Sequence, residues 1–241
     1  MHYWLVMPAA GVGRRFGDSV PKQYADLHGR AVIEWALAPF LADSRCAAAV
    51  VVIAASDPYW PEVARRLTAY GAVSTASGGT ERSASVRNGL RALEGRAAPG
   101  DWVLVHDAAR PCLPARDLDR LLGQVQSHPV GGLLASPAAD TLKRAEAGGE
   151  IAATVDRAGL WRALTPQMFR FGALREALER AAAAGRTPTD EAQAIEWTGA
   201  RPMVVEGSST NIKITSADDL VIARALLDAG RHTGGAGGSP T

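Results

Sequence analysis

A glycine-rich loop near the N-terminus carries residues whose types and spacing suit phosphate binding. The run from Pro8 to Gly17 reads Pro-Ala-Ala-Gly-Val-Gly-Arg-Arg-Phe-Gly and directly follows a short apolar segment. Small residues let the backbone approach a ligand closely, and glycine permits the dihedral angles that turn successive N–H groups toward an anion. Arg14, Arg15 and Lys22 supply positive charge. The loop therefore predicts a polyphosphate cradle; the alternative is a tight turn with a solvated basic rim.

Two common phosphate loops are excluded by the same residues. A dinucleotide fingerprint needs Gly or Ala three residues after its second glycine, where this chain has Phe16. The acidic residue expected about 20 positions further on is also missing. A Walker loop needs Gly-Lys-Ser/Thr, and no such tripeptide follows. We therefore expect any nucleotide here to be bound by a different loop geometry.

A second cluster, His106-Asp107-Ala108-Ala109-Arg110-Pro111, follows a buried apolar run. In open α/β sheets, ligands bind at the carboxyl ends of the strands. Asp107 at such an end could hold Mg²⁺ against phosphate oxygens, and Arg110 could contact a second anion. The alternative is that Asp107 caps the next helix and pairs with Arg110, while His106 packs as an ordinary strand-end histidine.

A third cluster, Gly78-Gly79-Thr80-Glu81-Arg82-Ser83-Ala84-Ser85, precedes a predicted helix. Backbone N–H groups at this position could bind the edge of a nucleotide base, and Ser85 lies one turn inside the helix. Thr80 is the predicted N-cap. A plain loop and helix cap is the alternative.

The scarcity of lysine points to the same regions. Of the 26 basic residues, only Lys22, Lys143 and Lys213 are lysine. Because the chain otherwise uses arginine, a lysine indicates a place where a compact ammonium is needed and a planar guanidinium does not serve. Chance placement is the alternative for any one of them.

Composition limits the function classes. The chain has 241 residues, a formal charge of +1, 47% hydrophobic residues and 21% charged residues, a balance typical of globular proteins. The small net charge argues against a nucleic-acid binder, and the longest apolar runs are too short for a transmembrane helix. Two cysteines without metal-ligand spacing and the absence of a signal peptide favour the cytoplasm.

The pattern of elements predicts the scaffold that positions these clusters. Strands are predicted over residues 3–7, 48–54, 72–76, 102–105 and 132–135, and helices over 31–41, 59–70, 81–93 and 115–126, with Pro39 kinking or shortening the first helix. This alternation predicts an α/β fold with a mostly parallel twisted sheet and helices on both faces. No element is predicted for residues 161–170.

Residues 137–160 break the pattern. They are polar, and Gly148-Gly149 separates two segments of similar length, which predicts a protruding β-hairpin arm. The arm has too few apolar residues to fold alone, so we expect a homodimer in which it packs on a second subunit.

The α/β pattern then resumes. Helices are predicted over 171–184, 190–198 and 217–227, the last with Ser216 and Asp219 as a capping box, and strands over 203–205 and 211–214. Residues 1–232 are predicted to form a single domain, and the glycine-rich tail 233–241 is predicted to be disordered.

Together the motifs resemble 2-C-methyl-D-erythritol 4-phosphate cytidylyltransferases of the non-mevalonate isoprenoid pathway, over about residues 4–228. The resemblance is carried, in chain order, by Pro8-Ala9-Ala10-Gly11-x-Gly13-x-Arg15, Pro21-Lys22-Gln23, Gly78-Gly79-x-Glu81-Arg82-x-x-Ser85-Val86, His106-Asp107-Ala108-Ala109-Arg110-Pro111, Asp140-Thr141, Asp156-Arg157, Leu164-Thr165-Pro166-Gln167, Thr189-Asp190-Glu191 and Asn211-Ile212-Lys213. The chain departs from the family at Thr80, where members often carry Asp.

The resemblance implies a Rossmann-like nucleotidyltransferase fold and transfer of a cytidylyl group from CTP to methylerythritol phosphate, with Mg²⁺ or another divalent cation. The residues it implies for CTP and the cation are Pro8, Ala9, Ala10, Gly11, Gly13, Gly79, Ser85 and Asp107, with Asp107 as the metal ligand. Those it implies for the acceptor are Asp107, Arg110, Thr141, Arg157, Thr165, Thr189 and Lys213, with Thr141 and Arg157 completing the neighbouring subunit's site. The catalytic residues it implies are Arg15, Lys22, Arg157 and Lys213.

Three other functions stay open at this stage. A polyol-phosphate cytidylyltransferase, for example one using ribitol phosphate, shares most of these motifs. A nucleotide-binding regulatory module without turnover is disfavoured because Arg15, Lys22, Asp107 and Lys213 are all present. A bifunctional enzyme with a later cyclodiphosphate synthase activity would need a further domain on the order of 150 residues, and only a short tail follows Leu227.

Overall fold

A seven-stranded sheet forms the centre of the computed structural model, which describes residues 1–11, 20–68 and 72–234. The strand order is β11–β7–β10–β6–β1–β4–β5. The strands are β1 (Tyr3–Pro8), β4 (Cys46–Ile53), β5 (Val73–Ser77), β6 (Trp102–Val105), β7 (Gly131–Pro137), β10 (Trp161–Arg170) and β11 (Met203–Glu206). Strand β1 pairs in parallel with β4 and β6, and β10 alone among these seven pairs antiparallel with its neighbours. The predicted mostly parallel α/β sheet is confirmed.

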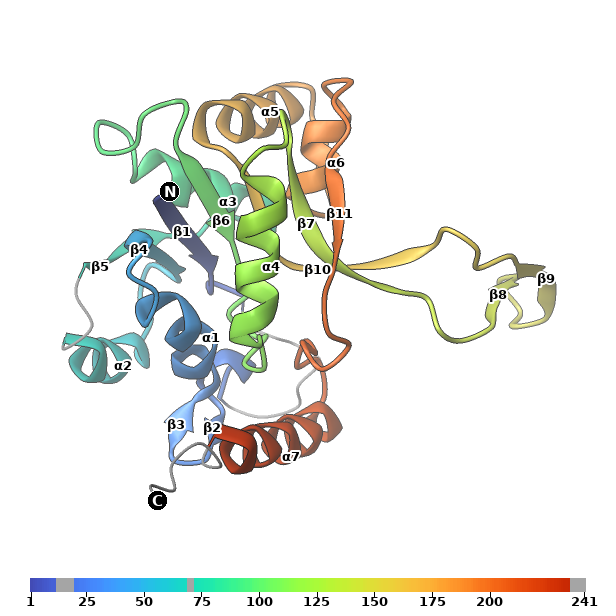
Figure 1. Ribbon diagram of the computed structural model, residues 1–241, viewed down its shortest axis with the longest axis horizontal. Coiled ribbons are helices and arrows are strands. Elements are labelled where there is room, and N and C mark those ends of the chain that lie inside the picture. Colours follow the sequence, from blue (N-terminus) through green and yellow to red (C-terminus); the bar gives the residue numbers. More distant parts are fainter. Residues whose placement is uncertain (12–19, 69–71, 235–241) are drawn as a thin grey trace, which may run out of the picture.

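Helices cover both faces of this sheet (Figure 1). They are α1 (Val32–Leu41), α2 (Trp60–Leu67), α3 (Arg82–Arg91), α4 (Ala115–Val125), α5 (Phe171–Ala183) and α6 (Glu191–Glu196). A further helix, α7 (Ala217–Gly234), packs on the body away from these faces. Alternation along β1 divides the core, because Leu5 and Met7 pack with α1, α2 and α4, whereas Val6 packs with α3, α5 and α6. Within the described residues, no helix combines the length and apolarity needed to cross a membrane.

Helix α3 lies unusually close to the sheet at Gly89. A Cβ atom at this position would lie 2.5 Å from Val6 Cγ1 and 2.8 Å from Val52 Cγ2. Only glycine lets the helix backbone approach these strands so closely. This contact sets the distance between α3 and the sheet. It thereby also positions the loop before the helix at the carboxyl ends of β1 and β4.

Residues between β7 and β10 project from the body as an arm (Figure 1). Strands β8 (Leu142–Ala145) and β9 (Ile151–Val155) pair antiparallel within the predicted hairpin region. Most of their residues are exposed, and Ile151 is 64% exposed. The longer strands β7 and β10 pair as far out as Pro137 and Trp161 and form the base of the arm.

A third apolar cluster holds the C-terminal helix against the body. It joins Leu27 of β2 (Asp26–Leu27), Val32, Cys112, Ile214 and Ala223. A short strand β3 (Arg30–Ala31) pairs with β2. Helix α7 begins with the predicted capping box, since Ser216 N–H donates to Asp219 Oδ2 at 2.9 Å. The helix extends to Gly234, beyond the predicted end at residue 227, and the rest of the predicted disordered tail lies outside the described residues.

Strand β10 is the main element that the sequence did not predict. Its ten residues, Trp-Arg-Ala-Leu-Thr-Pro-Gln-Met-Phe-Arg, contain a proline and lack regular alternation. The strand forms because β6 and β7 lie on either side of it and satisfy its backbone groups. The register shifts between Ala163 and Gln167, around the proline.

Two local predictions were wrong. Residues 211–214 form no strand; instead Ile214 N–H donates to Ala109 O at 2.8 Å, which ties the segment to the loop after β6. The N-cap of α3 is Glu81 rather than Thr80, and its side chain makes no capping hydrogen bond. The helix predicted over 31–41 is present as α1, which continues past Pro39 to Leu41 and is therefore not shortened by the proline.

The packing at Gly89 gives a stability prediction. Gly89→Ala should lower the free energy of unfolding by about 1–3 kcal/mol, because the new methyl group overlaps Val6 and Val52. Gly123→Ala in α4 is the matched control: nothing lies within 4 Å of its added Cβ, and removing a helical glycine should add about 0.5–1 kcal/mol. Urea denaturation of both variants measures the difference, and equal effects would contradict the close packing of α3.

Candidate active site

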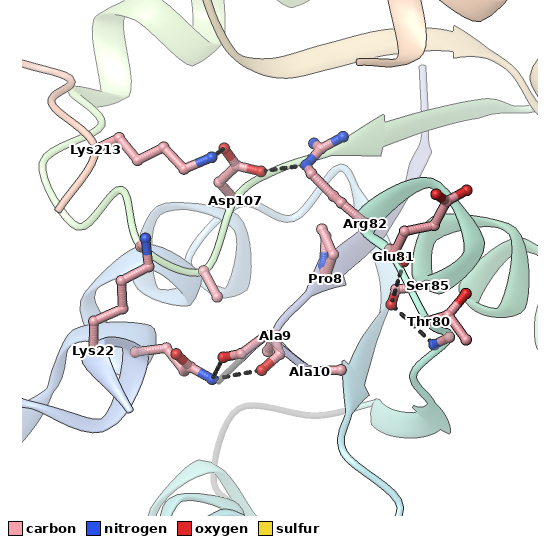
Figure 2. A pocket seen from close by; sticks show the side chains of 15 residues that line it. Pro8, Ala9, Ala10, Lys22, Thr80, Glu81, Arg82, Ser85, Asp107 and Lys213 are labelled. Atoms are coloured by element: carbon pink, nitrogen blue, oxygen red, sulfur yellow. Dashed lines mark hydrogen bonds and ion pairs between the residues drawn. The ribbon is translucent and has the colours of Figure 1, made fainter. Parts of the chain in front are cut away.

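A pocket of about 310 Å³ opens at the carboxyl ends of β1 and β6 (Figure 2). Three loops converge there: the turn after β1, the loop between β5 and α3, and the loop after β6. The 3₁₀ helix η1 (Lys22–Tyr24) and the segment before α7 complete its wall. The lining residues are Pro8, Ala9, Ala10, Gly11, Lys22, Gln23, Gly79, Thr80, Glu81, Arg82, Ser85, Asp107, Ala108, Ala109 and Lys213.

The turn after β1 is fixed by a buried side chain. Gln23 Nε2 donates to the carbonyl oxygens of Ala9 at 2.6 Å and Gly11 at 2.9 Å. Gln23 itself is buried. The Pro21-Lys22-Gln23 motif therefore places Lys22 at the pocket and uses its neighbour Gln23 to hold the glycine-rich turn.

The loop before α3 packs directly against the same turn. A Cβ on Gly78 would lie 2.2 Å from Ala10 Cβ, and one on Gly79 would lie 2.5 Å from Ala84 Cβ. Gly79 N–H donates to Ser85 Oγ at 3.0 Å, and Ser85 Oγ donates to Glu81 O at 3.1 Å. The Ser85 hydroxyl thus connects the two ends of the loop, from Gly79 to Glu81, through hydrogen bonds (Figure 2). Gly78 is the residue of this loop that lies against Ala10.

Asp107 is the electrostatic centre of the pocket. Its side chain is 8% exposed, its Oδ2 lies 2.8 Å from Lys213 Nζ, and its Oδ1 accepts from Arg82 Nε at 2.9 Å. Burial alone would raise the pKa of this carboxyl group, but the charges of Arg82 and Lys213 hold the pKa well below its usual range. Asp107 is therefore ionised at neutral pH.

A directed hydrogen-bond chain holds the backbone of Asp107. His106 Nε2 lies 3.1 Å from Arg110 O, which can only accept, so Nε2 carries the proton and Nδ1 accepts. Thr165 Oγ1, 2.9 Å from His106 Nδ1, must then donate to it. Thr165 Oγ1 in turn accepts from Asp107 N–H at 3.1 Å. Burial lowers the pKa of His106 to about 4, which keeps the imidazole neutral and the chain intact.

Arg110 holds the segment that carries Lys213. It is 8% exposed, its Nη1 donates to Asn211 O at 2.7 Å, and its Nε lies 3.7 Å from Asp107 Oδ2. Asn211 Nδ2 also donates to Thr165 O at 2.7 Å. Burial lowers the pKa of the Arg110 guanidinium. These bonds fix the segment that carries Lys213.

The structure brings together most, but not all, of the residues that the sequence singled out. The predicted residues that line the pocket are Pro8, Ala9, Ala10, Gly11, Lys22, Gly79, Ser85, Asp107 and Lys213. Arg110 and Thr165 do not line it; both are buried and contact Asp107. Thr189 is exposed near α6, and Thr141 and Arg157 belong to the arm, away from this pocket. Gly13 and Arg15 lie outside the described residues.

Two residues with no predicted role belong to the site. Arg82 joins Asp107 to Glu191, a buried residue of α6. Arg82 directly follows Glu81 in the glycine-rich loop motif, and Glu191 ends the Thr189-Asp190-Glu191 motif. Both were visible as motif residues, but only the fold shows that they meet.

Comparison with known proteins identifies one family. The model of the 2-C-methyl-D-erythritol 4-phosphate cytidylyltransferase family matches residues 3–229. A protein of that name from Pseudomonas aeruginosa is 53% identical over 220 residues, which are 91% of this chain and 93% of the relative. One of that name from Pseudomonas putida is 52% identical over 219 residues, 90% and 92% of the two chains.

Solved structures agree. The crystal structure of a 4-diphosphocytidyl-2C-methyl-D-erythritol synthase superposes with a TM-score of 0.81 at 41% identity, covering 94% of this chain and 99% of that one. The crystal structure of the 2-C-methyl-D-erythritol 4-phosphate cytidylyltransferase from Thermus thermophilus superposes with a TM-score of 0.74 at 32% identity, covering 92% of this chain and 98% of that one.

The hydrogen-bond chain predicts different outcomes for two substitutions of Thr165. Thr165→Val leaves the buried Asp107 N–H without its acceptor and should lower the free energy of unfolding by about 1–3 kcal/mol. The same substitution should also lower kcat. Thr165→Ser keeps the hydroxyl and should stay close to wild type in both. Thermal unfolding and steady-state kinetics measure the two effects. A valine variant that keeps wild-type stability and raises only the acceptor KM would make Thr165 a direct acceptor ligand instead.

Proposed function

The chain belongs to the 2-C-methyl-D-erythritol 4-phosphate cytidylyltransferase family, and on that basis we propose how its residues divide the work of the reaction. The enzyme is a nucleotidyltransferase of isoprenoid biosynthesis: it joins CTP and 2-C-methyl-D-erythritol 4-phosphate to give 4-diphosphocytidyl-2-C-methyl-D-erythritol and pyrophosphate. The observation that carries the proposed roles is the convergence of the β1 turn, the loop before α3 and the Asp107–Lys213 pair on one pocket.

We assign the nucleotide to the half of the pocket formed by the β1 turn and the loop before α3. We assign the contacts with cytosine to Ala9, Ala10, Gly79 and Ser85. Because their side chains are small, the two loops approach each other closely and leave a narrow space that suits a pyrimidine. Pro8, Gly11 and Lys22 would follow the triphosphate, together with Gly13 and Arg15. Lys22 lies on the side of the pocket opposite Thr80 and Ser85 (Figure 2). With cytosine bound next to Ser85, the triphosphate of CTP would extend toward Lys22.

The acceptor would lie between Lys213 and the arm of a second subunit. Lys213 would bind its phosphate, and Asp107 could accept a hydrogen bond from one of its hydroxyl groups. Thr189 lies exposed near α6, where it could reach the same substrate, whereas Arg110 and Thr165 would act through the groups they hold in place.

The position of Thr141 and Arg157 supports a homodimer. Both residues are exposed on the arm of their own chain, which also exposes Leu142, Ile151 and Trp161. Packing these apolar groups on a partner would bring Thr141 and Arg157 to the partner's acceptor site. We therefore propose one nucleotidyltransferase domain over residues 1–232, with residues 137–160 as its dimerisation arm. The two cysteines are free, which fits a cytoplasmic enzyme.

The donor set fits a divalent cation that is held mainly by substrate. Among the described residues, no three His, Cys, Asp or Glu side chains are grouped as a metal cage. Asp107 is an anion in the pocket, and Mg²⁺ is usually held by one or two carboxylates together with phosphate oxygens. When bound there, Mg²⁺ would neutralise charge on the triphosphate.

The chemistry requires positive charge and alignment more than a proton acceptor. An oxygen of the acceptor phosphate attacks the α-phosphorus of CTP and pyrophosphate leaves in line, so the P–O bond to the β-phosphate breaks as the new one forms. The nucleophile is already an anion, and no general base is needed. Arg15, Lys22, Arg157 and Lys213 would stabilise the charge of the transition state and hold the two phosphates in contact.

Lys22 provides the first test of these roles. Lys22→Ala should lower kcat by roughly 10²–10³-fold, the usual effect of deleting one group that stabilises transition-state charge. Lys22→Arg should recover little, because a planar guanidinium does not replace a compact ammonium. Steady-state kinetics decides, and near-normal turnover in either variant would remove Lys22 from the catalytic set.

Subunit mixing tests the arm. If Arg157 serves the partner's site, mixing equal amounts of inactive Lys22→Ala and inactive Arg157→Ala subunits should restore about a quarter of wild-type activity. About half of the dimers are then mixed, and each mixed dimer has one intact site of two. Lys22→Ala mixed with itself is the control. No recovery despite demonstrated subunit exchange would place Arg157 in its own subunit's site.

Substrate preference tests the whole assignment. Pyrophosphate release should be faster, in kcat/KM, with CTP than with UTP and with methylerythritol phosphate than with ribitol phosphate. Lys213→Ala and Arg157→Ala should raise the acceptor KM and lower kcat while changing the KM for CTP little. If the two variants affect only the KM for CTP, Lys213 and Arg157 bind the nucleotide and not the acceptor. If kcat/KM is higher with ribitol phosphate, ribitol phosphate is the acceptor.

A further inference from the structure

An ion pair between Arg82 of the pocket lining and the buried carboxylate of Glu191 lies next to Asp107. Glu191, at the first turn of α6, is 1% exposed, and Arg82 Nη1 and Nη2 donate to its Oε1 and Oε2 at 2.6 and 3.1 Å. The same guanidinium donates from Nε to Asp107 Oδ1 at 2.9 Å. Glu191, Arg82, Asp107 and Lys213 thus form a row of alternating charge that runs from α6 into the pocket (Figure 2 shows the last three).

The geometry of Arg82 matches this position closely. A guanidinium is planar and presents its N–H groups in a fixed fork, so binding two carboxylates along two of its edges fixes its orientation. The nucleotide and acceptor roles above leave Arg82 and Glu191 without a function. An arginine that lines a pocket for two phosphate-bearing substrates would bind a phosphate itself unless another anion held it.

We propose that Arg82 and Glu191 are positioning residues, which hold Oδ1 of Asp107 so that Oδ2 alone faces Lys213 and the substrates. Glu191 aligns Arg82 and keeps its charge away from the triphosphate. Arg82 then prevents the Asp107 carboxylate from rotating. Lys213, paired to the remaining oxygen, is held at the position from which it can bind the acceptor phosphate.

Glu191 is itself placed by contacts that reach the sheet. Asp190 is the N-cap of α6 and accepts from Gln193 N–H at 2.9 Å, while its other oxygen accepts from Gln167 Nε2 at 3.0 Å. Gln167 Oε1 accepts from Ala192 N–H at 2.8 Å. The first turn of α6 is therefore attached to β10, and the motifs around Gln167 and Glu191 act as one unit behind the pocket.

The proposal rests on the role given to Asp107 above, so the experiment includes that residue. Glu191→Gln and the charge-retaining Glu191→Asp are each compared with wild type, and Glu191→Gln is also combined with Asp107→Asn. We expect both single variants to lose about 10- to 100-fold in kcat, as misplacement of reacting groups does, with the KM for CTP changed less than about twofold. In the Asp107→Asn background, Glu191→Gln should cost less than about twofold more, because both changes act through the same carboxylate.

Glu176→Gln is the matched control, since Glu176 forms an exposed pair with Arg180 on α5, and it should leave the kinetics unchanged. If Glu191→Gln does not fold, Glu191→Asp carries the test. Wild-type kcat in the folded Glu191 variants, or losses that add fully to that of Asp107→Asn, would overturn the proposal. A rise confined to the KM for CTP would overturn it too and make Arg82 a triphosphate ligand. Wild-type activity of Asp107→Asn would instead refute the role of Asp107.

Discussion

The active pocket depends on keeping one carboxylate charged inside the protein. Burying Asp107 costs solvation free energy that only close cations can offset, and three of them, Arg82, Arg110 and Lys213, come from three separate segments of the chain. All three cations lower the pKa of this carboxyl group, so three segments that are distant in the sequence meet around one charge at the edge of the sheet. The same arrangement leaves a pocket whose charge suits two phosphate-bearing substrates.

Small residues and neutral hydrogen bonds provide the precision that charge alone cannot. Gly89 lets α3 approach β1, and Gly78 lets the loop before α3 approach the turn after β1, so closely that a Cβ at either position would overlap a neighbour. Gly79 lets the same loop fold tightly onto Ala84 of α3. The neutral imidazole of His106 gives its one proton to a carbonyl and so orients the Thr165 hydroxyl toward its other nitrogen. Several polar motif residues therefore stabilise the backbone of the site through hydrogen bonds within the protein.

The resemblance to the family identified the function correctly, and it implied contact roles for two residues that the structure shows in buried hydrogen bonds. Arg110 Nη1 donates to Asn211 O, and Thr165 is hydrogen-bonded to His106 and to Asp107 N–H. Direct contact of either residue with the acceptor stays a prediction. Arg82 and Glu191, to which no role was assigned, link α6 to the centre of the pocket. A motif shows that a residue type is required at a position, but not whether it touches the ligand.

The sequence determined the parallel strands, the helices between them and the functional clusters at the strand ends, because these follow from local hydrophobic patterns and loop residues. It did not determine β10, whose irregular pattern around Pro166 becomes a strand only between β6 and β7. Nor did it determine that residues 211–214, which have strand-like composition, are held as a loop by Ala109 and Arg110. The Arg82–Glu191 pair is 109 residues apart in the sequence. Such contacts have no local signal, since burial of a charge selects its partner only after the fold has brought the segments together.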